Sequence, residues 1–336
     1  MLNNVLVSVV CLTYNHEKYI RRTLDGFLAQ KTNFAFEIIV HDDASTDRTA
    51  EIIREYAAAY PDLFHPILQT RNQFSQGVQI KRDIIFPVAR GKYIAHCEGD
   101  DYWIDPLKLQ KQVDFLEANP DYSASTHNCC FVDGEGNPID SIYPMYRHCA
   151  SHRYTLKRFA ADVVYPGQTA TLVHRKDAFC EFNSEEEKDA FYGMRIATGD
   201  KRMYLKLLTV GDIYCFEDTM SAYRIVTQGG DSWTAKTRDK NLSYALHVAS
   251  IDFRQYVKKY AGKPFANYYT TFHTGVAGIV KSVIRPTPEN KEVCRRIVQL
   301  HHGVVGTAIY LLGLGLISIP LYFSRRKESR KYEIKD

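Results

Sequence analysis

Three acidic side chains lie within four positions of one another in this sequence. Glu98, Asp100 and Asp101 directly follow an apolar run from Tyr93 to Cys97, which is typical of a buried strand. Neighbouring carboxylates repel one another, and a bound divalent cation removes that cost. Mg²⁺ is commonly held by one or two carboxylates together with substrate phosphates. The stretch predicts a site for Mn²⁺ or Mg²⁺, although by itself it also fits a solvated acidic turn.

Two further polar turns follow apolar runs nearer the N-terminus. Asp42 and Asp43 follow the run Glu37 to His41, and a second set follows the run Leu6 to Leu12. The residues of that second set are Thr13, Tyr14 and Asn15. Because open α/β sheets bind ligands at the carboxyl ends of their strands, all three turns are expected at one binding edge.

These polar residues also have a structural interpretation. Thr13 and Asn15 can cap the helix that carries Ile20, Leu24, Phe27 and Leu28, and Asp42 and Asp43 can cap the next helix. The two roles are compatible, so the pattern leaves both open.

Alternating strand and helix patterns predict the rest of the fold. Two helices are expected, one beginning at Asp105-Pro106 and one over 200–209. Three strands are expected, over Tyr122–Val132, Gln168–Val173 and Tyr214–Tyr223. Residues 139–165 give no clear assignment. From about residue 236 the pattern becomes helical. The fold class expected is α/β, with a sheet flanked by helices and a C-terminal helical extension.

Composition excludes several classes of function. The chain has 336 residues and a formal net charge of +4, which argues against general nucleic-acid binding. Its eight cysteines form no CxxC pair, and this favours a reducing compartment. Residues 1–4 have no basic region before an apolar stretch, so the N-terminus is expected to begin a strand and not a secretion signal.

The segment Val304 to Phe323 is uncharged over twenty residues, and basic residues flank it on both sides. As a helix it is long enough to match a bilayer core, but Gly306, Gly313 and Pro320 interrupt it. Basic residues on both flanks favour a hairpin-like segment or one lying in the plane of the membrane, anchored to anionic lipid. A single spanning helix and a buried core helix remain the alternatives.

The ordered motifs resemble the family 2 glycosyltransferases with the GT-A fold. The residues that carry the resemblance are Leu12-Thr13-Tyr14-Asn15, then Asp42-Asp43-Ala44-Ser45-Thr46-Asp47, then Gly91-Lys92-Tyr93-Ile94 leading to Gly99-Asp100-Asp101. They cover roughly the first 130 residues, and Thr198-Gly199-Asp200 extends the resemblance to about residue 235. The resemblance implies a Rossmann-like mixed sheet and a nucleotide-sugar donor.

The resemblance also assigns roles to particular residues. It places Asp43 against a uracil base, with Asp42 and Thr13-Tyr14-Asn15 lining the same pocket. It implies that Asp101 binds the metal directly, and that Asp100 either binds the ribose or shares the metal with Asp101. Glu98 departs from the aspartate that is commonest at its position in this family, so only a water-mediated role is expected of it.

Asp200 is the expected catalytic base, and a simple helix cap is its structural alternative. One base without a second nucleophile implies inversion at the anomeric carbon. Tyr102 and Trp103 can stack on a sugar ring or belong to the core. The glycine-rich loop 228–233 can close over a substrate or form an ordinary turn.

The sequence therefore predicts an inverting, metal-dependent glycosyltransferase for surface-glycan synthesis, with a lipid-linked or glycan acceptor. The expected divisions are 1–235 for the GT-A domain (1–130 nucleotide-binding, 131–235 acceptor), 236–300 for a helical extension, and 301–336 for a membrane-associated segment. The protein is expected at the cytoplasmic face of the inner membrane, as a peripheral or monotopic membrane protein. Oligomeric state is open. The alternatives are a nucleotidyltransferase, disfavoured because residues 13–18 lack glycine, and an inactive nucleotide- or sugar-binding scaffold.

Overall fold

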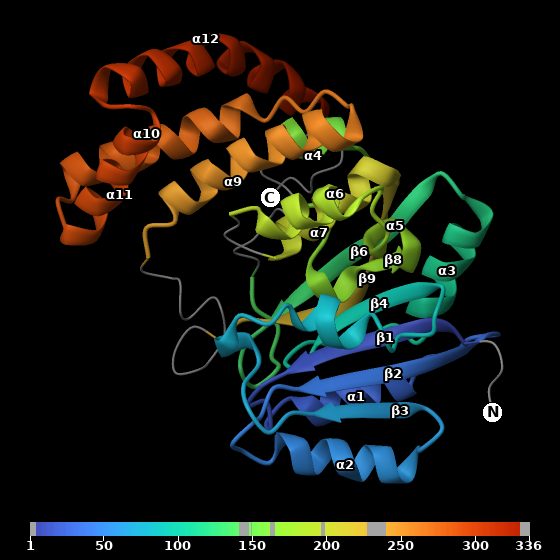
Figure 1. The fold of residues 1–336 in the computed structure, drawn as a ribbon. Coiled ribbons are helices and arrows are strands. Elements are labelled where there is room, and N and C mark those ends of the chain that lie inside the picture. Colours follow the sequence, from blue (N-terminus) through green and yellow to red (C-terminus); the bar gives the residue numbers. More distant parts are fainter. Residues whose placement is uncertain are drawn as a thin grey trace.

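The fold is a nine-stranded mixed sheet with helices on both faces and a helical bundle at the C-terminal end (Figure 1). A computed structural model describes residues 5–140, 148, 150–161, 165–195, 199–226 and 240–329. The main strand order is β3-β2-β1-β4-β8-β6-β9-β5, and β7 pairs with β9. This arrangement confirms the expected fold class.

One half of the sheet is parallel. Its strands are β1 (Val5–Thr13), β2 (Ala35–Asp42), β3 (Phe64–Leu68) and β4 (Tyr93–Glu98). β1 lies between β2 and β4 and pairs with both. Because this central strand is covered on both faces, it reads as a continuous apolar run and not as an alternating one.

The other half of the sheet has mixed strand directions. Its strands are β5 (Tyr102–Trp103), β6 (Tyr122–Val132), β7 (His152–Tyr154), β8 (Val173–Arg175) and β9 (Asp212–Arg224). β8 joins the halves, pairing antiparallel with both β4 and β6. The last residues of β9 pair antiparallel with β5, which directly follows the acidic turn after β4.

Helices cover the sheet and bury two apolar clusters against it. The helices before the C-terminal bundle are α1 (Ile20–Leu28), α2 (Thr49–Ala59), α3 (Lys108–Ala118), α4 (Leu156–Ala161), α5 (Lys176–Cys180), α6 (Glu185–Gly193) and α7 (Gly199–Val210). Short helical turns are η1 (Phe74–Gln76), η2 (Lys81–Ile85) and η4 (Thr169–Thr171). Val9 packs with α1–α3, whereas its neighbour Val10 packs with α5–α7 on the opposite face.

The C-terminal region consists of α9 (Ser243–Tyr256), the turn η5 (Val257–Ala261), α10 (Tyr268–Ile284), α11 (Pro288–Leu300) and α12 (Val304–Ser329). Phe253 and Val257 share the apolar cluster of α7, which attaches this bundle to the sheet domain. In the described part of the chain, no single helix has both the length and the apolar composition of a membrane span. Pro288–Leu300 and Val304–Ile317, bent by 83° at their break, pass that test only as a pair.

Several expected elements differ from the observed ones. Gln168–Val173 was expected as a strand, but 169–171 form η4 and only Val173 continues into β8. The side chain of Gln168 accepts a hydrogen bond from the backbone N–H of Ala170, and Thr171 Oγ1 donates to the Gln168 carbonyl. These local bonds favour a turn over an extended chain. The helices α4, α5 and α6 and strand β7 were not predicted.

Candidate active site

The three polar turns meet at one edge of the sheet, as expected. Thr13 at the end of β1 lies opposite Asp42 of β2, and Leu12 lies opposite Glu98 of β4. The backbone N–H of Asp43 donates to the Thr13 carbonyl, and that of Gly99 donates to the Leu12 carbonyl. Strand register therefore fixes all three turns side by side.

The carboxylates of Glu98, Asp100 and Asp101 converge at this edge. One oxygen from each lies within 4.8 Å of the other two. Burial, followed by the charges of Asp100 and Glu98, raises the pKa of Asp101 well above its ordinary value. Such a set of hard oxygen ligands suits Mg²⁺ or Mn²⁺, which would also relieve the repulsion.

Asp101 is held rigidly from two directions. Its Oδ2 accepts a hydrogen bond of 2.7 Å from Nε2 of Gln168, and its Oδ1 accepts one of 2.9 Å from the backbone N–H of Arg224. Its own carbonyl accepts a bond of 2.6 Å from Thr23 Oγ1. Asp101 is fully buried, so the orientation of its carboxylate is set by the protein and not by solvent.

Arg224 also fixes the backbone of the acidic turn. Its Nε donates to the carbonyl of Asp100 at 2.9 Å, and its Nη1 donates to the carbonyls of Asp133 and Gly134. The guanidinium lies 4.5 Å from the ring centroid of Tyr19. Arg224 thus connects the end of β9 to the acidic turn.

Asp200 belongs to the same site. It lies in the first turn of α7, where the helix dipole favours an anion. Burial, followed by the charges of Asp200 and Asp100, raises the pKa of Glu98 to about 7, while Lys81 opposes the shift. Asp200 is therefore near enough to act electrostatically on the acidic cluster, although it comes from a distant part of the chain.

The first two turns are built mainly by hydrogen bonds among their own residues. Asn15 Oδ1 accepts the backbone N–H of Thr46 at 2.8 Å, and the Asn15 N–H donates to Ser45 Oγ at 2.8 Å. Asp42 Oδ2 accepts the Ser45 N–H at 3.1 Å. Asn15 itself has a φ of 55°, a conformation that asparagine tolerates better than most residues.

The capping alternative for these residues is not what the structure shows. Asp47, not Asp42 or Asp43, accepts the backbone N–H of Thr49 at the start of α2, at 2.9 Å. Asp43 instead accepts the backbone N–H groups of Gln73 and Phe74, at 2.7 and 3.1 Å. Asp43 therefore organises the loop that begins η1.

Two of the residues expected to bind the nucleotide have features that suit a ligand. The hydroxyl of Thr13 is buried and, within the described residues, has no hydrogen-bond partner. Tyr14 is half-buried at the same edge. Buried polar groups are rarely left unsatisfied, so an unpaired hydroxyl at a strand end is a candidate ligand contact.

Tyr102 and Trp103 lie in the core, which argues against stacking on a sugar. The indole N–H of Trp103 donates to the Ala170 carbonyl at 3.0 Å, and its ring packs edge-on against Phe27. The ring of Tyr102 is covered by Arg22, whose guanidinium lies 3.8 Å from the centroid. Both side chains are 4% exposed. The loop 228–233 and Thr198 lie outside the described residues.

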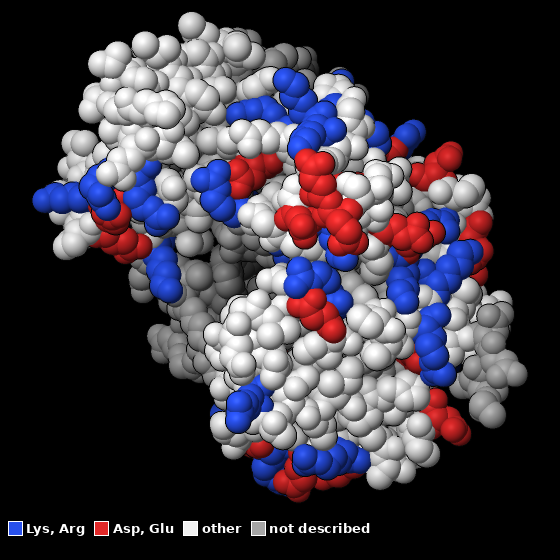
Figure 2. All heavy atoms as spheres, viewed as in Figure 1, with Lys and Arg blue, Asp and Glu red and all other residues white. Residues whose placement is uncertain are grey.

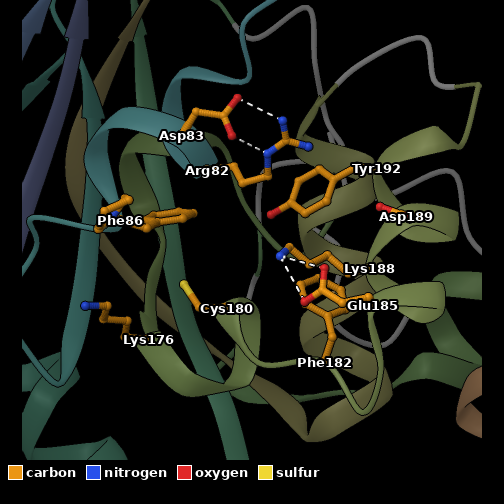
Figure 3. A pocket seen from close by; sticks show the side chains of 11 residues that line it. Arg82, Asp83, Phe86, Lys176, Cys180, Phe182, Glu185, Lys188, Asp189 and Tyr192 are labelled. Atoms are coloured by element: carbon orange, nitrogen blue, oxygen red, sulfur yellow. Dashed lines mark hydrogen bonds and ion pairs between the residues drawn. The ribbon is translucent and has the colours of Figure 1, made fainter.

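A separate hollow of about 670 Å³ opens beside η2, between α5 and α6 (Figure 3). Four of the charged side chains that line it form two ion pairs, Arg82 with Asp83 and Lys188 with Glu185. The residues that line it include none of the four carboxylates of the candidate site. This hollow is therefore distinct from the acidic cluster.

Sequence reasoning missed the residues that support the acidic turn. Gln168, Arg224 and Thr23 are 67, 123 and 78 positions from Asp101. No local motif marks a supporting contact over such separations. The charge of Lys81 opposes the pKa shift of Glu98, so this lysine also lies near the acidic cluster.

Comparison with known proteins gives the family. Residues 8–178 match the family described as glycosyl transferase family 2. An uncharacterised protein of Mycobacterium tuberculosis (strain H37Rv) is 49% identical over 138 residues, which is 41% of this chain and 39% of that protein. The Escherichia coli UDP-Glc:alpha-D-GlcNAc-diphosphoundecaprenol beta-1,3-glucosyltransferase WfaP is 34% identical over 112 residues, 33% of this chain and 41% of that protein. The matches thus span about two fifths of these relatives.

Solved structures agree on the fold. The S. aureus protein TarS, residues 1–349 in complex with UDP-GlcNAc, superposes with a TM-score of 0.63 at 15% identity, covering 97% of this chain and 92% of that one. The mannosyltransferase PcManGT of Pyrobaculum calidifontis, in complex with GDP-Man and Mn²⁺, gives 0.50 at 15% identity, covering 94% and 87%. The family match spans half of the chain and the sheet agrees with it, so the chain belongs to glycosyl transferase family 2.

Proposed function

We propose that this glycosyltransferase moves a sugar from a UDP-sugar to a hydroxyl of a lipid-linked or polysaccharide acceptor, with inversion and with help from Mn²⁺ or Mg²⁺. The observation that carries the proposal is the convergence of Glu98, Asp100 and Asp101 at one sheet edge, with Asp200 near enough to act electrostatically on Glu98. The names of similar proteins support it. WfaP is named for a UDP-sugar donor and a diphosphoundecaprenol acceptor, and TarS was solved with UDP-GlcNAc.

Asp101 and Asp100 would hold the cation, with Glu98 beside them. A bound divalent ion acts as a Lewis acid toward the departing diphosphate. The bonds from Gln168 and Arg224 keep the carboxylate of Asp101 in place before the donor arrives. Since metal binding needs deprotonated ligands, Glu98 releases its proton as the site fills.

The nucleotide would lie against the turns after β1 and β2. The unpaired hydroxyl of Thr13 and the half-buried ring of Tyr14 suit a ribose and a flat base. Asp43 already accepts two backbone N–H groups, but a carboxylate has lone pairs for a further donor such as the uracil N–H. In this proposal Asn15 and Asp42 act by holding the two turns together.

Asp200 would accept the proton of the acceptor hydroxyl as that oxygen attacks the anomeric carbon. The acceptor oxygen forms the new glycosidic bond, the bond from the anomeric carbon to the diphosphate breaks, and the nucleoside diphosphate leaves. A single displacement of this kind inverts the anomeric configuration. The base must come within about 3 Å of the hydroxyl in the bound complex.

The test is to incubate the purified protein and Mn²⁺ with a panel of nucleotide sugars and acceptors. Nucleotide release and the anomeric configuration of the product are measured by NMR. We expect release from a UDP-sugar, an inverted product, and a loss of roughly 10²–10⁴ in kcat for Asp200→Asn with little change in donor affinity. A retained configuration, or full turnover by Asp200→Asn, would contradict the proposed mechanism.

A further inference from the structure

Helix α12 is apolar on two opposite faces. Its inner face packs on the bundle, with Leu311 and Leu314 each 7% exposed. A row on its outer face is open to solvent, with exposures between 39% and 81%. The residues of this outer row are Val305, Ile309, Leu312, Leu316 and Ile319. A surface helix of a soluble protein normally turns a polar face outward, so this exposed apolar row indicates a binding surface.

The apolar surface continues onto α10. Gly275 of α10 approaches Leu311, and Phe272 approaches Gly315, so the two helices run antiparallel in close contact. This pairing brings the last turn of α10 to the end of the bundle where α12 begins. Val283 and Ile284 of that turn are 75% and 72% exposed. They extend the outer row at its N-terminal end.

Exposed cations surround the same end of the bundle. Lys281 lies in the last turn of α10 and Arg285 directly follows that helix, and α11 carries Lys291, Arg295 and Arg296. Arg295 pairs with Glu292 of its own helix, whereas no carboxylate is paired with Lys281, Arg285 or Lys291 within the described residues. Figure 2 shows basic side chains over α11 beside the largely uncharged surface of α10 and α12.

Charge is also divided unequally along the chain. Residues 240–329 contain thirteen Lys and Arg residues against four Asp and Glu residues, although the whole protein carries a net charge of only +4. The helical bundle is thus strongly cationic and the rest of the protein is net acidic. Such a division orients a protein toward an anionic surface.

We propose that the outer row of α12, with Val283 and Ile284, docks on an anionic phospholipid bilayer. The helix lies in the plane of the interface, its outer row among the acyl chains and the cations of α10 and α11 at the lipid phosphates. The inner face remains packed on α10. A second copy of this chain is the less suitable partner, because it would bring the same excess of positive charge to the contact. The anionic cytoplasmic leaflet has the required chemistry.

The test is flotation of the full-length protein with phosphatidylcholine vesicles that contain about 30% phosphatidylglycerol. We expect the wild type to float with these vesicles and far less with pure phosphatidylcholine. A triple variant, Ile309→Gln, Leu312→Gln and Leu316→Gln, should partition at least about tenfold less. A second variant, Lys281→Gln, Arg285→Gln and Lys291→Gln, should lose binding to anionic vesicles and its sensitivity to salt.

The matched control changes two exposed valines of the sheet domain, Val88→Gln and Val210→Gln, which are 53% and 55% exposed. It should float like the wild type. Circular dichroism, and nucleotide release from the donor in the presence of a soluble acceptor, should be unchanged in every variant, so a failed flotation result leaves the proposed chemistry standing. Equal flotation of the triple variant and wild type would overturn the proposal. So would a wild-type dimer that does not float and that the triple variant converts to monomer.

Discussion

The side-chain amide of Gln168 donates a hydrogen bond of 2.7 Å to the carboxylate of Asp101, 67 residues earlier in the chain. The other end of the amide is fixed too, because Gln168 Oε1 accepts the backbone N–H of Ala170 at 2.6 Å. The N–H₂ group must therefore face Asp101. The expected metal ligand is oriented by a residue that is not itself an expected ligand.

Replacing Gln168 by Leu should weaken metal binding without removing any metal ligand. Loss of a partner that orients a ligand typically lowers metal affinity roughly 10–100-fold. Isothermal titration with Mn²⁺ measures the change, and thermal unfolding checks that η4 still forms. Gln110→Leu, at a partly exposed position of α3, is the control. An unaltered Mn²⁺ affinity in folded Gln168→Leu protein would show that Asp101 needs no such support.

The metal-free protein should lose stability as the pH rises through the range in which Glu98 ionises. Burial, together with Asp200 and Asp100, raises the Glu98 pKa from 4.5 to about 7. Between these values the folded state binds more protons than the unfolded state, so the free energy of unfolding falls as pH increases. Because Glu98 is partly exposed, we expect a loss of only about 1–2 kcal/mol between pH 5 and pH 8.

Urea unfolding at several pH values, with EDTA present, measures that loss. Glu98→Gln should flatten part of the decline, and the remainder comes from Asp101, whose pKa is raised in the same direction. Saturating Mn²⁺ should restore stability at pH 8, because the cation binds the ionised carboxylates. A metal-free stability that rises over this range would mean that the carboxylates do not crowd one another.

Gly99 is the residue that lets the acidic turn pack against the first turn. A Cβ atom at this position would lie 2.6 Å from Thr13 Oγ1 and 2.9 Å from His16 Nδ1. Gly99→Ala should therefore cost about 1–3 kcal/mol of unfolding free energy and weaken nucleotide binding as the turns separate. Gly193→Ala, where a Cβ meets nothing within 4 Å, is the matched control. Equal stability of the two variants would contradict the close packing of the turns.

The sequence predicted the elements whose signals are local. The runs 6–12, 37–41 and 93–97 became parallel strands, and the acidic turns lie at their carboxyl ends because the strand direction requires it. Tyr122–Val132 was confirmed residue for residue as β6. The family and the fold class were predicted from the motifs in these same turns, and both predictions were confirmed.

The remaining features depend on contacts between distant residues. Trp103 follows two aspartates and looks like a sugar-stacking residue, but Phe27 and Ala170 enclose it. Gln168 lies in a segment with the pattern of a strand, and its side chain forms a turn instead. Arg224 belongs to no sequence motif that would mark its contact with Asp101. Such roles are set by which elements pack together, and a single sequence does not contain that information in its local pattern.

In the proposed mechanism Asp101 holds a cation for the donor diphosphate, while Asp200 accepts the proton of the acceptor hydroxyl. Titration calorimetry of UDP, with and without Mn²⁺, tests it on wild type, Asp101→Asn and Asp200→Asn. We predict Mn²⁺-assisted UDP binding by wild type and Asp200→Asn, and a loss of roughly 10²-fold or more in Asp101→Asn, with all three proteins folded. Asp101→Ala should likewise abolish transfer without unfolding the protein. Mn²⁺-assisted binding that persists in Asp101→Asn, or that is absent from folded wild type, would contradict the account.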